Sequence, residues 1–172
     1  INQNTIRDNI AEDINQTNYG ENRDAVVRMV SEEVGNKTAT LKITNNVLSN
    51  NSGGSGIYFS GFGTVLIDGN TISNGGSGSN AFGIRVGMGL NDVTISNNTV
   101  EDNSGGGVYV NGGKPYYISD SIMDWASNVI VSDNIVRRNS GTGIEAVFYL
   151  RCTGNIISGN GSGFKGGSSG SY

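Results

Sequence analysis

The sequence predicts an all-β solenoid, in which short strands form coils that stack on one another. A nine-residue pattern with two Asn and two apolar positions recurs along the 172-residue chain. Around these Asn positions apolar residues alternate with polar ones, so alternate side chains are expected to point into a common interior. The chain also holds 28 Gly and 24 Asn, many of them at the turns between the apolar runs.

The recurring pattern predicts six coils joined by an Asn ladder. Its second Asn follows the first by five residues in every coil except the third, where Gly75 takes that place. An Asn amide both donates and accepts hydrogen bonds, so stacked copies can satisfy one another at a buried turn. The spacings between the first Asn residues are 42, 24, 28, 36 and 21, because these residues are Asn4, Asn46, Asn70, Asn98, Asn134 and Asn155.

Two more short strands complete each coil. One precedes the Asn pattern, at residues 41–43, 65–67, 93–95, 129–131 and 150–152. The other begins with Gly, at residues 56–59, 83–86, 107–110, 143–146 and 163–165. We expect this Gly to permit a sharp bend with positive φ. Cys152 stands where other coils carry Ile or Val, which predicts a small buried apolar residue.

The repeat predicts one domain over residues 1–165, followed by a Gly/Ser-rich tail over 166–172. Residues 10–40 form an irregular, more charged insertion. Within it, 24–30 could supply the missing Gly-led strand, with Ala25, Val27 and Met29 inside, or 23–34 could form an amphipathic helical turn. Because Ile1 lies inside the first copy of the pattern, we expect a fragment of a longer solenoid or a subunit whose open ends stack.

This repeat resembles the right-handed parallel β-helix of pectate-lyase-like proteins and of carbohydrate-binding and sugar-hydrolase repeat modules. The resemblance covers nearly the whole chain and implies an extracellular, cell-surface or periplasmic protein that acts on polysaccharide. It also implies that the Gly-led strand comes first in each coil, on the sheet that commonly carries the substrate groove. The shared residues are structural, so the resemblance specifies the fold more strongly than the function.

One residue in each Gly-led strand is expected to face outward, because its two neighbours face the interior. Aromatic rings pack on the C–H faces of sugars, and Arg pairs with carboxylates, so such a column suits a sugar chain. Ordinary cross-strand pairing explains the same residues without a ligand. The column runs through Arg28, Tyr58, Arg85, Tyr109, Glu145 and Lys165, of which Tyr58, Arg85, Tyr109 and Glu145 are predicted to bind substrate.

Residues 111–128 form a long loop that follows the same strand and holds the only Pro and the only Trp of the chain. Long insertions beside a repeated face are where solenoids place binding residues. Tyr116 and Trp125 are therefore further candidates for substrate binding, unless the aromatic half of the loop packs back on the coil.

The sequence does not decide between catalysis and simple binding. A lyase or epimerase needs a charge neutraliser and a base, for which the candidates are Arg85, Tyr109 and Lys114. A glycosidase needs paired carboxylates, for which the candidates are Glu145, Asp120 and Asp124. The motifs NTD, DD, GHG and RIK of polygalacturonase-like hydrolases are missing. The alternative is a non-catalytic structural or adhesive module, such as a spike, adhesin or filament subunit.

Charge and composition limit the other partners. The net charge of −4 disfavours broad binding to nucleic acid or anionic membranes. No apolar run approaches the roughly 18 residues of a membrane-spanning helix. The absence of His excludes His-based triads and His metal sites. The Asp- and Asn-rich turns lack the ligand spacing of an EF-hand, so we expect no cofactor and no specific calcium site.

Overall fold

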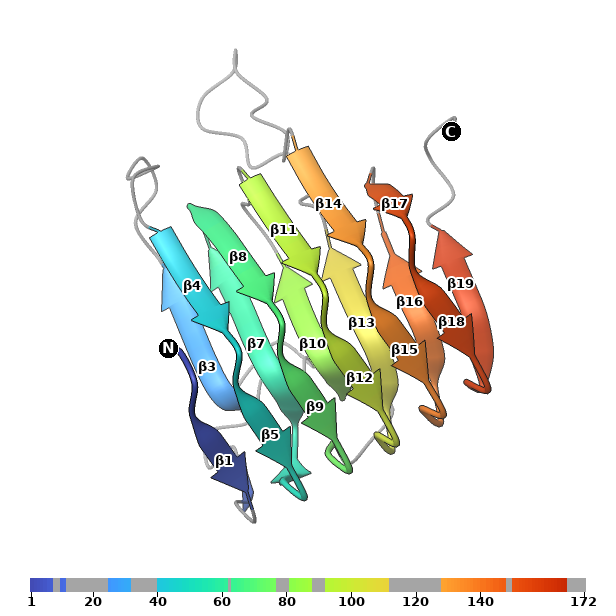
Figure 1. Ribbon diagram of the computed structural model, residues 1–172, viewed down its shortest axis with the longest axis horizontal. Helices are drawn as coiled ribbons and strands as arrows, with labels where there is room; N and C mark the ends of the chain where they lie inside the picture. The colour runs from blue at the N-terminus through green and yellow to red at the C-terminus, as the bar shows by residue number, and fades with distance from the viewer. Residues whose placement is uncertain are drawn as a thin grey trace, which may run out of the picture.

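The computed structural model describes residues 1–7, 10–11, 25–31, 40–61, 63–76, 81–87, 92–111, 128–147 and 150–166. These residues form a parallel β-helix, in which three sheets surround one interior (Figure 1). Each sheet takes strands from successive coils, and neighbouring strands are parallel. The predicted all-β solenoid of about six coils is confirmed.

The first sheet contains the strands that precede the Asn turns: β4 (Thr40–Thr44), β8 (Thr64–Asp68), β11 (Asp92–Ser96), β14 (Asn128–Ser132) and β17 (Arg151–Thr153). The second sheet contains the strands that follow them: β1 (Thr5–Arg7), β5 (Val47–Ser49), β9 (Thr71–Ser73), β12 (Thr99–Glu101), β15 (Ile135–Arg137) and β18 (Ile156–Ser158).

The third sheet, here called the glycine sheet, contains the Gly-led strands: β3 (Ala25–Ser31), β7 (Ser55–Gly61), β10 (Phe82–Gly87), β13 (Gly106–Asn111), β16 (Thr142–Ala146) and β19 (Ser162–Gly166). Two short strands, β2 (Ile10–Ala11) and β6 (Ser52–Gly53), form a separate pair. Since β3 pairs with β7 and Val27 is buried, the described part of 24–30 is a strand rather than a helical turn.

The interior is a stack of Ile, Val and Leu side chains from all three sheets. Register places equivalent residues of successive coils side by side, such as Ile67 beside Ile95 and Ile84 beside Val108. Each of these four side chains is fully buried. A single coil cannot bury its own apolar face, so the stack of coils makes the core.

The predicted Asn ladder is confirmed and carries two hydrogen bonds at each buried rung. The main-chain N–H and the Nδ2 of Asn98 both donate to Oδ1 of Asn134, each at 2.9 Å. Oδ1 of Asn98 accepts the same pair of bonds from Asn70, at 2.9 and 3.0 Å. A second ladder joins Asn103, Asn139 and Asn160 in the same way. The side chains therefore satisfy the polar groups that the turns bury.

The residue immediately before each ladder Asn has a left-handed backbone. Examples are Asn97 at φ 54° and Asp133 at φ 56° before the first ladder, and Asp102 at φ 56° before the second. Asn, Asp and Gly tolerate this conformation better than other residues, which explains why they recur at these positions. Gln3 and Arg138 depart from that rule, with φ 53° and 54°.

In the inner coils, the Gly that leads the strand of the glycine sheet is needed for space, not for positive φ as predicted. Gly56, Gly83, Gly107 and Gly143 lie outside the left-handed region. A Cβ at Gly143 would lie 2.6 Å from Cγ2 of Ile157 and 2.8 Å from the carbonyl oxygen of Gly163. The bend brings the main chain at Gly143 close to Ile157 of the second sheet and to the main chain of the next coil at Gly163, so a side chain at Gly143 has no space.

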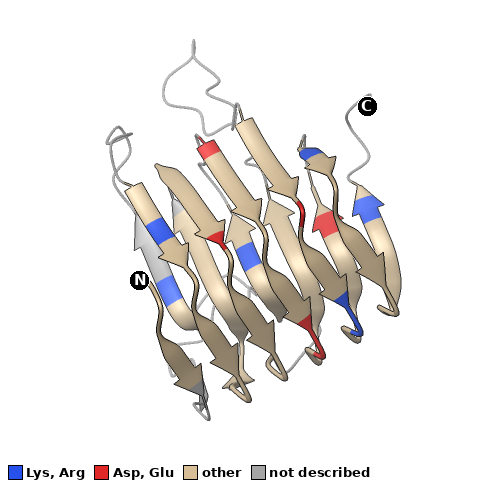
Figure 2. Cartoon of the chain, viewed as in Figure 1, with Lys and Arg blue, Asp and Glu red and all other residues tan. Residues whose placement is uncertain are grey.

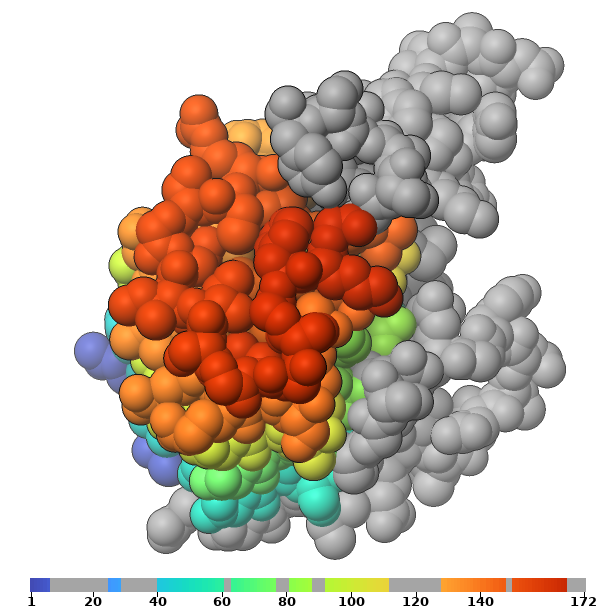
Figure 3. Space-filling view, turned by 90° about the vertical axis from the view of Figure 1, so that its right-hand side faces the viewer, coloured from blue at the N-terminus to red at the C-terminus, as the bar shows by residue number. Residues whose placement is uncertain are grey.

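The last described coil, β17 to β19, has its interior-facing side chains uncovered (Figure 3). Phe164 is 46% exposed, although its partner Ile144 in the preceding coil is fully buried. Cys152 is likewise exposed, so the prediction that it is buried is wrong. Cys152 pairs with Val131 of β14, and β17 is the last strand of its sheet, so no described coil covers its other side.

Candidate ligand-binding face

The outer face of the glycine sheet carries the predicted column of side chains. The register pairs Arg85 with Tyr58 on one side and with Tyr109 on the other. Tyr109 pairs in turn with Glu145, and Glu145 with Lys165. Arg28, on β3, begins the same column beside Tyr58. The alignment that the repeat predicted is therefore confirmed for all six residues.

The accessibility of this column differs from the sequence prediction. Tyr58 is only 3% exposed and Arg85 only 8% exposed. Tyr109 and Glu145 are partly exposed, and Arg28 and Lys165 are exposed. Tyr58 and Arg85 thus lie on the predicted face, but the expectation that they are exposed to solvent is wrong. The alternation of residues along a strand determines which face a side chain lies on, but it does not determine whether other residues cover that side chain.

Tyr109 is the centre of an aromatic and cationic cluster. Cζ of Arg85 lies 5.0 Å from the centroid of the Tyr109 ring. The ring of Phe82 lies 5.1 Å from the Tyr109 ring, tilted by 41°. Sequence reasoning missed Phe82, which stands just before the Gly-led run of its strand. The sequence signal that could have indicated Phe82 is Gly106, an additional Gly before the leading Gly107, because Gly106 lies opposite Phe82 in the neighbouring strand.

Glu145 and Lys165 form an ion pair at the C-terminal end of the column. Nζ of Lys165 lies 2.7 Å from Oε1 of Glu145. This hydrogen bond is the main reason that the pKa of Lys165 is raised, with the charge of Glu145 adding to it. Cross-strand pairing, the simpler explanation of these residues, is therefore present in the structure.

A second outward column runs beside the first, through Ser60, Gly87 and Asn111. A Cβ at Gly87 would contact only Cβ of Asn111, at 3.7 Å, so this position has room for a side chain. The Oδ1 atom of Asn111 is buried and accepts no hydrogen bond in the structure described.

The remaining candidates from the sequence lie outside the described residues. These are the possible catalytic residues and the loop aromatics, namely Lys114, Tyr116, Asp120, Asp124 and Trp125. Within the described ranges there is no group of three or more acidic or Cys side chains that could hold a metal ion. The described chain also contains no helix long and apolar enough to cross a membrane.

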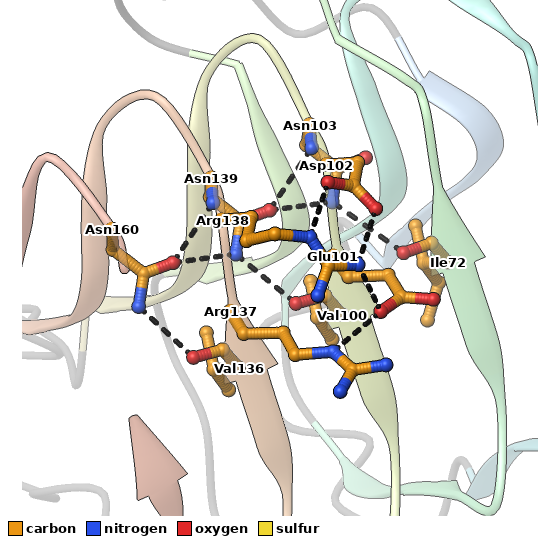
Figure 4. Close-up of polar contacts among 10 residues, drawn as sticks. All are labelled: Ile72, Val100, Glu101, Asp102, Asn103, Val136, Arg137, Arg138, Asn139 and Asn160. Atoms are coloured by element: carbon orange, nitrogen blue, oxygen red, sulfur yellow. Dashed lines mark hydrogen bonds and ion pairs between the residues drawn. The ribbon is translucent and has the colours of Figure 1, made fainter. Parts of the chain in front are cut away.

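The outer faces of the other two sheets are different in character. The described strands of the first sheet carry as many charged residues as those of the glycine sheet, namely Lys42, Asp68, Asp92 and Arg151 (Figure 2). Neither the first nor the second sheet carries an aromatic residue on its described strands. Their main charged cluster joins two coils at the second sheet (Figure 4). Nε of Arg137 lies 2.7 Å from Oε2 of Glu101, and Nη2 of Arg138 lies 2.7 Å from Oδ2 of Asp102. The hydrogen bond from Arg138 lowers the pKa of Asp102. These carboxylates and guanidinium groups pair with one another across the coils, which suits a structural role.

The architecture defines a parallel β-helix domain with one chemically distinct face. Residues 33–172 match the family model described as a right handed beta helix region. The chain therefore belongs to the right-handed β-helix family. No curated protein and no solved structure matches the chain.

Proposed function

We propose that this right-handed β-helix binds a polysaccharide along the outer face of the glycine sheet, outside the cell or in the periplasm. The observation that carries the proposal is the partly exposed Tyr109 ring, flanked by Arg85 and Phe82. Aromatic rings are suited to sugars because they present a large flat surface with little conformational freedom. All described aromatic residues lie on strands of this one sheet. Of these, Tyr58, Phe82 and Tyr109 belong to the outer face, whereas Phe59 and Phe164 face the interior.

The geometry of the sheet also suits an extended ligand. Equivalent side chains on neighbouring strands repeat about every 4.8 Å, so six strands present a column of roughly 25 Å. A chain of several sugar units can extend along this face and contact its neighbouring accessible residues, namely Tyr109, Glu145 and Lys165.

Substitution of Tyr109 tests this proposal. We expect Tyr109→Ala to weaken binding to any polysaccharide found on a glycan array by tenfold or more, since stacking on an aromatic residue is lost. Ile130→Ala, on the outer face of the first sheet, should bind as the wild type does. Affinity electrophoresis and titration calorimetry measure both. The proposal fails if no polysaccharide binds, or if the two substitutions weaken binding equally.

A lyase or epimerase reaction on the same face would use Tyr109 as the base. Arg85 suits the role of charge neutraliser less well, because it is only 8% exposed and its guanidinium lies over the Tyr109 ring. Glu145 suits a glycosidase less well, because its carboxylate is paired with Lys165. Incubation with uronate polymers, followed by absorbance of the unsaturated products, separates a lyase from a binding protein.

A second candidate function is assembly through stacked coils, as in a spike, adhesin or filament. It is favoured by the last described coil, where Phe164 is 46% exposed. The N–H of Asn155 donates to no described residue, whereas the N–H of Asn134 donates to Oδ1 of Asn155. Such a face can pair with one further coil, whether more of the chain or another molecule supplies it.

Light scattering over a concentration series tests assembly by this chain. We expect the mean mass to rise with concentration, and Phe164→Asp to abolish that rise. Val47→Asp is the matched control, because Val47 is an exposed apolar residue on the outer face of the second sheet, 41% exposed. A mass of one chain at every concentration would exclude assembly.

A further inference from the structure

The Tyr109 ring is held in its orientation by Phe82, which is itself held by contacts with the strands on either side of it. Phe82 lies directly opposite Gly106 in the neighbouring strand. A Cβ at Gly106 would overlap Cε1 and Cδ1 of the Phe82 ring, so the ring occupies the space that Gly106 leaves. Phe82 is only 7% exposed, and its ring contacts that of Tyr109.

The main chain of Phe82 is anchored from the opposite side. Its N–H donates to Oγ of Ser55, at 3.1 Å, and Ser55 is completely buried in the preceding coil. Phe82 is thus held between Ser55 on one side and Gly106 on the other. Tyr109 in turn has Phe82 and Arg85 against it, so its ring is presented in a fixed position.

Among the described residues, the charged side chains next to Tyr109 in the column already interact within the protein. Arg85 is mostly buried and lies over the Tyr109 ring, and Glu145 is 2.7 Å from Lys165. The exposed Arg28 lies three strands away, roughly 14 Å at the usual strand spacing. A carboxylate on a sugar bound at Tyr109 would therefore gain little from these groups, whereas the C–H face of its ring would gain stacking contact with the exposed part of the Tyr109 ring.

We infer that Tyr109 is a stacking subsite for an uncharged pyranose ring and that Phe82 is the residue that positions it. This inference rests on the proposed polysaccharide function and names its substrate class. Binding should depend on ring stacking and not on ionic attraction, so added salt should leave it unchanged.

The test compares a neutral polymer, galactan, with its acidic counterpart, polygalacturonate, as probes for the full chain. We expect the wild type to prefer galactan, with an affinity that is the same in low and in high salt. Phe82→Leu should weaken galactan binding roughly three- to tenfold, the size of a lost aromatic pair. Phe82→Tyr, which keeps the ring, should restore it. Leu66→Ala, on the outer face of the first sheet, is the control.

The outcomes separate the inference from the function on which it rests. If the wild type binds no glycan on a broad array, the proposed function itself fails. If it binds only polygalacturonate and releases it in salt, the function stands and the uncharged subsite is wrong. If Phe82→Leu binds galactan as tightly as the wild type, Phe82 has no positioning role. Urea unfolding of each variant checks that a loss of binding is not a loss of fold.

Discussion

Gly107→Ala should destabilise the protein by about 3 kcal/mol or more, because overpacking a rigid core costs this much where the backbone cannot move away. A Cβ at Gly107 would overlap Cγ1 of Val136 and the carbonyl oxygen of Gly143. Nδ2 of Asn139 would lie 3.2 Å away. All three atoms belong to the next coil, in β15, in β16 and in the turn between them, and moving that coil away would break the strand pairing and the Asn ladder that join the two coils. Urea unfolding, followed by circular dichroism, measures the change.

The same substitution in the last described coil provides a matched control. Gly163 stands at the position equivalent to Gly143, and a Cβ there would meet no atom within 4 Å. Gly163→Ala should therefore change the free energy of unfolding by less than about 0.5 kcal/mol, and Ala can stabilise slightly by restricting the unfolded chain. Equal effects at Gly107 and Gly163 would show that space is not what these glycines provide.

Asn98→Ala should remove one of the fully bonded inner rungs of the Asn ladder, which Asn70 and Asn134 also form. It removes the acceptor of two bonds from Asn70 and a donor that lies within 2.9 Å of oxygens in Ile67, Ser96 and Asn134. Asn98 is 1% exposed, so water cannot replace these bonds. Each buried polar group left without a partner costs about 1 to 3 kcal/mol, which predicts a total loss of roughly 4 kcal/mol.

The first rung of the ladder provides the control for this prediction. Asn4 bonds to Asn46 in the same way, at 3.0 and 3.1 Å, but it is exposed. Asn4→Ala should cost less than about 1 kcal/mol, since water can bond to the groups it leaves. The ladder would be irrelevant to stability if Asn98→Ala unfolded at the same urea concentration as Asn4→Ala.

The fold could be predicted from the sequence because every coil has the same structural requirements and meets them with the same residue types. A buried turn needs an amide that satisfies itself, and a stacked strand needs an apolar residue at alternate positions. Two details could not be predicted this way. The role of the leading Gly depends on which atoms of the next coil lie close to it. The exposure of Cys152 depends on whether another coil packs on its coil, and the sequence of its own coil does not show this.

The candidate site could be predicted only in part. Register follows from the repeat, so the column from Arg28 to Lys165 was correctly aligned. Accessibility does not follow from register, and Tyr58 and Arg85 are buried on the predicted face. Phe82 was missed because its position depends on the empty space at Gly106, a contact between coils. The five candidates in the 111–128 loop stay predictions.

Nuclear magnetic resonance of the labelled chain, with and without a bound polysaccharide, tests most directly whether the glycine sheet is the binding face. We predict that the signals of Tyr109, Glu145 and Lys165 shift on binding, while those of Lys42 and Ile130 on the first sheet do not. Larger shifts on the first or second sheet than on the glycine sheet would contradict this assignment of the binding face.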